Sequence, residues 1–146
     1  MEHLIIKHVH KLVMTNLEAA KELKVAEAHF IDQKLIVFFG KLAGYHENNA
    51  EQLKQWLSEH KAPKASENSG IGFMERILMD FQINFALDEE RKAVKSCEKV
   101  VKHVLSIYQK ALSTSNDETL TALLVEQEQQ VAESLQTLED FIALLA

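Results

Sequence analysis

The segment from Glu27 to His60 constrains the fold of this chain more than any other part of the sequence. Its apolar side chains recur every three or four residues, which is the spacing of one face of an α-helix. The members of this stripe are Ile31, Leu35, Phe38, Leu42, Leu53 and Trp56. The run from Leu35 to Phe39 is apolar on every side, so we expect this helix to be buried on more than one face. Halfway along, Tyr45, His46 and Asn49 interrupt the stripe, and we interpret this interruption as the record of a site that is absent.

The rest of the chain has the same periodicity and few residues that break helices. Its 146 residues include four glycines and one proline, Pro63. This pattern predicts an all-α protein. The predicted helices cover residues 3–24, 27–60, 71–85, 89–112 and 116–145. A loop from Lys61 to Gly70 starts a long crossover, which contains the short helix 71–85. The shorter connections predict antiparallel helix pairs, and the spacing of Ser115 and Glu118 is typical of a capping box at the start of the last helix.

The composition excludes several classes of protein. A net charge of −6 with only two arginines, and no basic stripe with interleaved aromatic residues, argue against a nucleic-acid partner. The single cysteine, Cys97, cannot form an internal disulfide, which fits a reducing compartment. The first residues form too short an apolar run for a signal peptide or a membrane span. We therefore expect one cytoplasmic domain over residues 1–146, with no membrane partner.

Several short segments point to a particular family. They are Leu42-Ala43, Ala50-Glu51-Gln52-Leu53, Ser69-Gly70, Cys97-Glu98, residues 108–112, and Gln127 with Val131 and Leu138. Together with the crossover plan, these segments resemble a bacterial ferritin-like family of unknown function, from about Ala28 onward. The resemblance implies a ferritin-like up-down four-helix bundle with a long crossover containing a short extra helix.

The resemblance also implies where metal ligands would stand. Iron-binding members of the ferritin-like superfamily place a Glu on each of two helices and Glu-x-x-His on the other two. The corresponding positions here are His46 and Asn49, Val101, and the neighbourhood of Gln127 and Gln130. None of these is a carboxylate, whereas a di-iron centre needs carboxylates to balance its charge. The sequence therefore predicts a bundle without a di-iron centre and without a cofactor.

We expect the polar residues near the inner stripes to pair as a buried hydrogen-bonded layer that fixes the register of the helices. The predicted members of this layer are Asn16, Tyr45, His46, Asn49, Tyr108 and Gln127. No catalytic residue is predicted, because Cys97 stands among valines and a thiol in such surroundings is inert. The leading hypothesis is a binding or interaction module rather than an enzyme.

The alternative hypothesis is a metal-binding or redox protein of the ferritin-like superfamily with an altered site. The metal would be iron or another divalent ion. Its ligands would be His46 with carboxylates from Glu18, Glu22, Glu47 and Glu98. At least three of these groups must converge for such a site to form, and only His46 lies near an inner stripe.

The helix 27–60 also has apolar residues on more faces than one bundle core can use. Ile36, Val37 and Phe39 flank its stripe, and Ile6 and Val13 lie outside the stripe of the first helix. Contiguous exposed apolar surface is unusual on a monomer. We therefore expect a homodimer that packs this helix against its symmetry mate. Gly40 and Gly44 form a smooth patch on the helix, where the crossover helix or a second subunit would approach closely.

Overall fold

The computed structural model describes residues 2–60, 62 and 90–145, and every element in that part of the chain is an α-helix. The helices are α1 (Glu2–His29), α2 (Gln33–Glu59), α4 (Glu90–Thr114) and α5 (Glu118–Leu144). The prediction of an all-α protein is confirmed. The helix expected at 71–85 and the loop before it lie outside the described residues.

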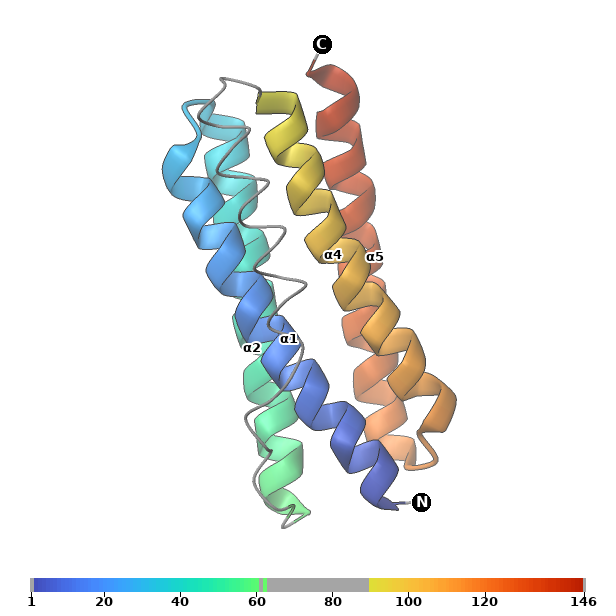
Figure 1. Cartoon of the computed structure of the whole chain (residues 1–146). Coiled ribbons are helices and arrows are strands. Elements are labelled where there is room, and N and C mark those ends of the chain that lie inside the picture. The colour runs from blue at the N-terminus through green and yellow to red at the C-terminus, as the bar shows by residue number, and fades with distance from the viewer. Residues whose placement is uncertain (1, 61, 63–89, 146) are drawn as a thin grey trace.

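The four helices lie side by side as an elongated bundle (Figure 1). α1 and α2 run in opposite directions, and so do α4 and α5, whereas α2 and α4 run in the same direction. The end of α2 and the start of α4 therefore lie at opposite ends of the bundle. α1 packs against α2 and α4, and α4 packs against α5, while the contact between α2 and α5 is the least extensive.

The turn between the first two helices falls later than the sequence predicted. α1 continues to His29, and α2 begins at Gln33 rather than near Glu27. Asp32 is the N-cap of α2, because its side chain accepts hydrogen bonds from Lys34 N at 2.8 Å and Leu35 N at 3.4 Å. Such a cap satisfies amides that the first turn of a helix leaves unpaired. Ile31, predicted to be part of the inner stripe, therefore lies in the turn and is 94% exposed.

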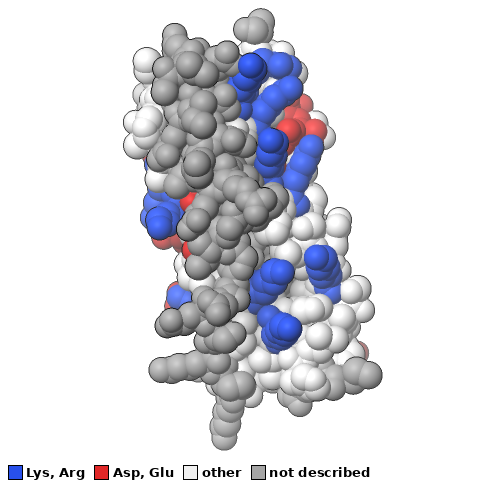
Figure 2. All heavy atoms as spheres, viewed as in Figure 1, with Lys and Arg blue, Asp and Glu red and all other residues white. Residues whose placement is uncertain are grey.

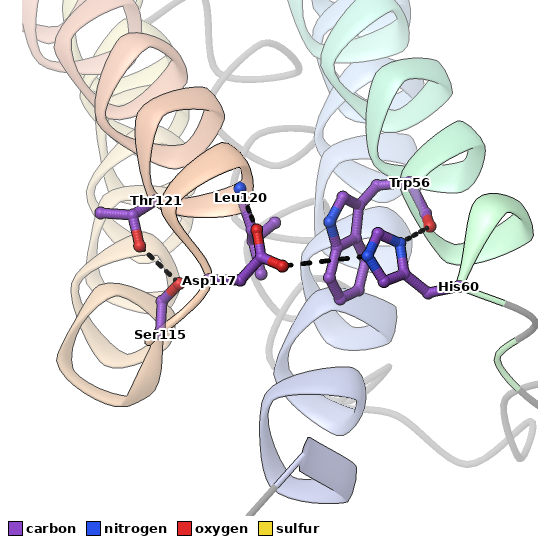
Figure 3. A network of polar contacts seen from close by, with 6 residues as sticks. All are labelled: Trp56, His60, Ser115, Asp117, Leu120 and Thr121. Atoms are coloured by element: carbon purple, nitrogen blue, oxygen red, sulfur yellow. Dashed lines mark hydrogen bonds and ion pairs between the residues drawn. The ribbon is translucent and has the colours of Figure 1, made fainter.

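The start of α5 also differs from the prediction. Asp117, and not Ser115, is the N-cap, and its Oδ1 accepts a hydrogen bond from Leu120 N at 2.8 Å (Figure 3). The hydroxyl of Ser115 instead lies 2.7 Å from that of Thr121. A carboxylate at this position suits the positive end of the helix dipole, which a serine hydroxyl does not complement as well.

The same carboxylate connects the ends of two helices. Asp117 Oδ2 lies 3.9 Å from Nε2 of His60, the C-cap of α2 (Figure 3). His60 donates from Nδ1 to the carbonyl oxygen of Trp56 at 2.9 Å, and its ring stacks on the indole at a centroid distance of 4.1 Å. The C-terminus of α2 and the N-terminus of α5 thus lie beside each other at one end of the bundle, where the protonated form of His60 pairs with Asp117.

The core takes up more of the apolar surface than expected. Phe39 and Val13, predicted outside the stripes, are both buried. Phe39 makes an edge-to-face contact with Phe30 at a centroid distance of 4.8 Å, because the late turn folds Phe30 back over α2. Val37, by contrast, is 47% exposed.

The two glycines of α2 have different surroundings. At Gly40 a Cβ atom would lie 3.0 Å from Glu27 Oε1, so a side chain of α1 approaches closely there. At Gly44 a Cβ atom would meet no atom of the described residues within 4 Å. The predicted smooth patch is therefore occupied at one of its two positions by a side chain of the same chain.

Candidate functional site

A chain of hydrogen bonds crosses the bundle core and takes one residue from each helix. His46 Nδ1 of α2 lies 2.7 Å from Asn16 Oδ1 of α1. Asn16 Nδ2 donates to the Tyr108 hydroxyl of α4 at 3.0 Å, and that hydroxyl donates to Gln127 Oε1 of α5 at 2.7 Å. All four side chains are at most 2% exposed. We refer to Asn16, His46, Tyr108 and Gln127 as the polar layer.

The hydrogen bonds fix the proton positions in the polar layer. Asn16 Nδ2 also donates to Leu12 O at 2.9 Å, so its Oδ1 is the acceptor and His46 Nδ1 carries the proton. Burial lowers the pKa of His46 to about 4. Burial also raises the pKa of Tyr108, with a smaller opposing effect from its bond to Asn16. The imidazole and the phenol are therefore both uncharged near pH 7.

Gln127 extends the polar layer back to α2. Its Nε2 donates to Gln52 Oε1 at 2.9 Å and to Asn49 O at 3.3 Å. These bonds connect α2 and α5, a pair of neighbouring helices with little other contact. Gln52 was not predicted as a member of the site, although it lies three residues after Asn49 and so shares a helix face with it.

Asn49 and Tyr45, the other two predicted members of the layer, differ in their burial. Asn49 is buried as expected, at 2% exposed. Within the described part of the chain, its Nδ2 and His46 Nε2 are buried atoms without a hydrogen-bond partner. Tyr45, predicted as a member of the layer, is 43% exposed and takes no part. Successive residues on a helix point about 100° apart, so burial of His46 turns Tyr45 towards the surface.

Two of the four candidate carboxylates pair with lysines away from His46. Glu47 Oε1 forms an ion pair with Lys24 Nζ at 2.7 Å, and its side chain is 46% exposed. Glu98 Oε1 lies 3.7 Å from Lys102 Nζ on its own helix. The structure therefore does not bring these two carboxylates to the imidazole.

The other two candidate carboxylates lie on α1. Glu22 is buried, and the burial, followed by the nearby charge of Glu18, raises its pKa to about 7. Glu22 in turn raises the pKa of the Cys97 thiol, for which burial is the larger cause. In the ranges that the structure describes, no three His, Cys, Asp or Glu side chains converge as metal ligands would.

Basic residues gather over α4 on the face shown in Figure 2. The exposed basic residues of this helix are Arg91, Lys92, Lys95, Lys99, Lys102 and Lys110. The sequence does not show them as a cluster, because they are spread over twenty residues and come together only along one side of a helix. The large exposed aromatic residue of the described chain, Tyr45, lies on α2 and not among them. Among the described residues, therefore, this stripe has no exposed ring beside it on which single-stranded nucleic acids could stack.

The fold and the core define the chain as an all-α four-helix bundle with an uncharged polar layer. Residues 4–114 match the family described as "Domain of unknown function (DUF2383)". This match covers about three quarters of the 146 residues, from α1 to the end of α4. The chain belongs to this family. No curated protein and no solved structure matches it significantly. Among the helices that the structure describes, none has the length and apolar character needed to cross a bilayer.

Proposed function

We propose that this chain is a ferritin-like bundle whose core holds the polar layer in place of a di-iron centre. In this proposal it acts as an interaction module and not as an enzyme. The observation that carries the proposal is the hydrogen-bonded path from His46 to Gln127, which uses only neutral groups. The helix directions also support a ferritin-like plan, because the end of α2 and the start of α4 lie at opposite ends of the bundle (Figure 1).

The donor groups of the polar layer do not fit a di-iron centre. Two iron ions in apolar surroundings need several carboxylates to balance their charge and to bridge them. The layer offers two amides, a phenol and one imidazole, and the imidazole already donates its Nδ1 proton to Asn16. The alternative, an altered site for iron or another divalent metal around His46, has less support, because Glu47 and Glu98 pair with lysines elsewhere.

The surface that supports an interaction role is a groove between α2 and α5 with a volume of about 400 Å³. The residues that line this α2/α5 groove are Gln33, Lys34, Val37, Phe38, Lys41, Thr137 and Phe141. The rings of Phe38 and Phe141 form its floor, with centroids 5.1 Å apart. Val37 is 47% exposed beside them. Exposed apolar surface of this kind marks interaction sites, and we propose that a second copy of the chain binds there.

Val37→Glu is expected to weaken this association. A carboxylate placed against the apolar floor of a partner's groove loses its hydration, a cost that Lys34 and Lys41, one turn away on the same helix, offset only in part. We expect the dissociation constant of the dimer to rise by about a hundredfold or more, which is about 3 kcal/mol. Sedimentation equilibrium at micromolar concentration measures it, and the monomer mass is 16.6 kDa.

Val125→Glu is the matched control. Val125 is 38% exposed on α5 and does not line the groove, so this variant should associate as the unmodified chain does. A monomeric unmodified chain, or equal dimerisation by both variants, would remove the support for this interaction surface.

A further inference from the structure

The helices that form the two walls of the α2/α5 groove differ in charge, although the α5 residues that line the groove, Thr137 and Phe141, are themselves uncharged. Lys34 and Lys41 of α2 line the groove. α5 contains six acidic residues and neither lysine nor arginine. Two of these, Glu133 and Asp140, lie four residues before and three residues after Thr137, on the same side of the helix as this groove residue.

Within the described part of the chain, the charged groups of Lys34, Lys41, Glu133 and Asp140 form no ion pairs. Neither Lys34 nor Lys41 lies within ion-pair distance of a described carboxylate. Asp140 accepts only a hydrogen bond from the neighbouring amide of Gln136, at 3.1 Å. An apolar floor with lysines along α2 and acidic residues beside it on α5 is therefore open to a partner with the reverse arrangement.

Two contacts fix the register of the antiparallel helices α2 and α5. Phe38 meets Phe141, and Gln52 bonds to Gln127, so the contacts are fourteen residues apart on both helices. Lys41 follows Phe38 by three residues, so in this antiparallel pair it lies level with Leu138, which precedes Phe141 by three residues. Leu138 and Asp140 are two residues apart, which is about 3 Å along the helix axis. Lys41 and Asp140 thus lie at nearly the same height on opposite walls.

This arrangement selects one kind of two-fold symmetry. An axis parallel to the helices keeps every residue at its height and exchanges the walls, so α2 of one copy lies over α5 of the other. An axis across the helices would instead place α5 on α5, and both carry only acidic charges. Because isologous interfaces are self-complementary, the charges favour the parallel axis.

We propose that the α2/α5 groove is an isologous dimer interface with its two-fold axis parallel to the bundle. Lys41 of each copy pairs with Asp140 of the other, and the two apolar floors cover one another. This inference rests on the proposed binding of a second copy at the groove and specifies the symmetry axis and the charge pair of that dimer.

A charge-swap experiment tests the arrangement. Lys41→Glu places like charges at both contacts of its homodimer, and so does Asp140→Lys. Each variant alone should bind itself at least tenfold more weakly than the unmodified chain at low ionic strength, where charges are least screened. An equimolar mixture of the two variants forms heterodimers in which both contacts join unlike charges, so dimerisation should return. A single chain carrying both substitutions should also dimerise.

The control pair reverses exposed charges on the same two helices, in Lys54→Glu and Glu139→Lys. Glu139 lies two residues after Thr137 and therefore faces away from the side of α5 that Thr137 and Asp140 share. These variants should dimerise as the unmodified chain does, alone or mixed. Circular dichroism verifies that every variant is folded.

The outcomes separate the two proposals. If the unmodified chain dimerises but the mixture of Lys41→Glu and Asp140→Lys does not recover, the parallel-axis arrangement is wrong and the interaction function stands. The same conclusion follows if each variant alone dimerises normally. If the unmodified chain is a monomer, both proposals are wrong.

Discussion

Asn16→Leu is expected to lower the free energy of unfolding by about 3 kcal/mol. Asn16 accepts a hydrogen bond from His46 and donates one to Tyr108, so leucine would leave two buried polar groups without these partners. Each such group costs about 1–3 kcal/mol. For a domain of this length the melting temperature should fall by roughly 6–12 °C. Urea denaturation and scanning calorimetry measure the two quantities.

The matched control for this prediction is Asn48→Leu. Asn48 is exposed on α2, so its substitution by leucine makes the same change in side-chain chemistry outside the core. Surface substitutions of this kind usually change stability by about 0.5 kcal/mol or less. If Asn16→Leu is as stable as the control, the polar layer does not contribute to stability through these bonds.

Acid should affect His46 and Glu22 in opposite directions. The pKa of His46 is lowered from 6.5 to about 4 in the folded chain, so between these values the unfolded chain binds more protons. The stability that neutral His46 provides is therefore complete above pH 6.5 and is lost as the pH falls towards 4. The change is on the order of 3 kcal/mol.

Glu22 reverses this dependence. Its pKa is raised from 4.5 to about 7, so in that window the folded chain holds a proton that the unfolded chain has released. Its contribution is complete below pH 4.5 and is lost as the pH rises through 7. In the unmodified chain the two groups offset one another over the range that they share, which flattens the pH dependence.

Removing one group at a time should reveal the other. Relative to the unmodified chain, the unfolding free energy of Glu22→Gln should rise more steeply with pH between 4.5 and 6.5. For His46→Gln, the unfolding free energy should fall with pH over the same range, relative to the unmodified chain, because only Glu22 then contributes to the pH dependence. Denaturant titrations at several pH values give these slopes. Equal slopes for all three proteins would show that neither group titrates as its burial implies.

The sequence was sufficient to predict the parts of this structure that depend on periodicity. Four long helices follow from apolar residues at helical spacing, and Asn16 and Gln127 were identified because each falls on an otherwise apolar stripe. The phase of a helix is known from sequence only to within about one residue, so Tyr45 was grouped with His46 although it points to the surface.

Features that depend on packing could not be predicted in the same way. The turn at residues 30–32 contains neither glycine nor proline, and Asp32 is recognisable as a cap only once the helix start is known. Glu22 is buried because it lies on the side of α1 that packs against other helices. A glutamate in the sequence does not by itself indicate burial. The α2/α5 groove depends on how closely two helices approach, which no local pattern specifies.

The central claim is that the core of this bundle holds a neutral polar layer and not a di-iron centre. Metal analysis and absorption spectroscopy of protein expressed in iron-supplemented medium test it most directly. We predict iron far below one equivalent per chain and no oxo-bridged absorption band. Near-stoichiometric, tightly bound iron together with that band would contradict the claim.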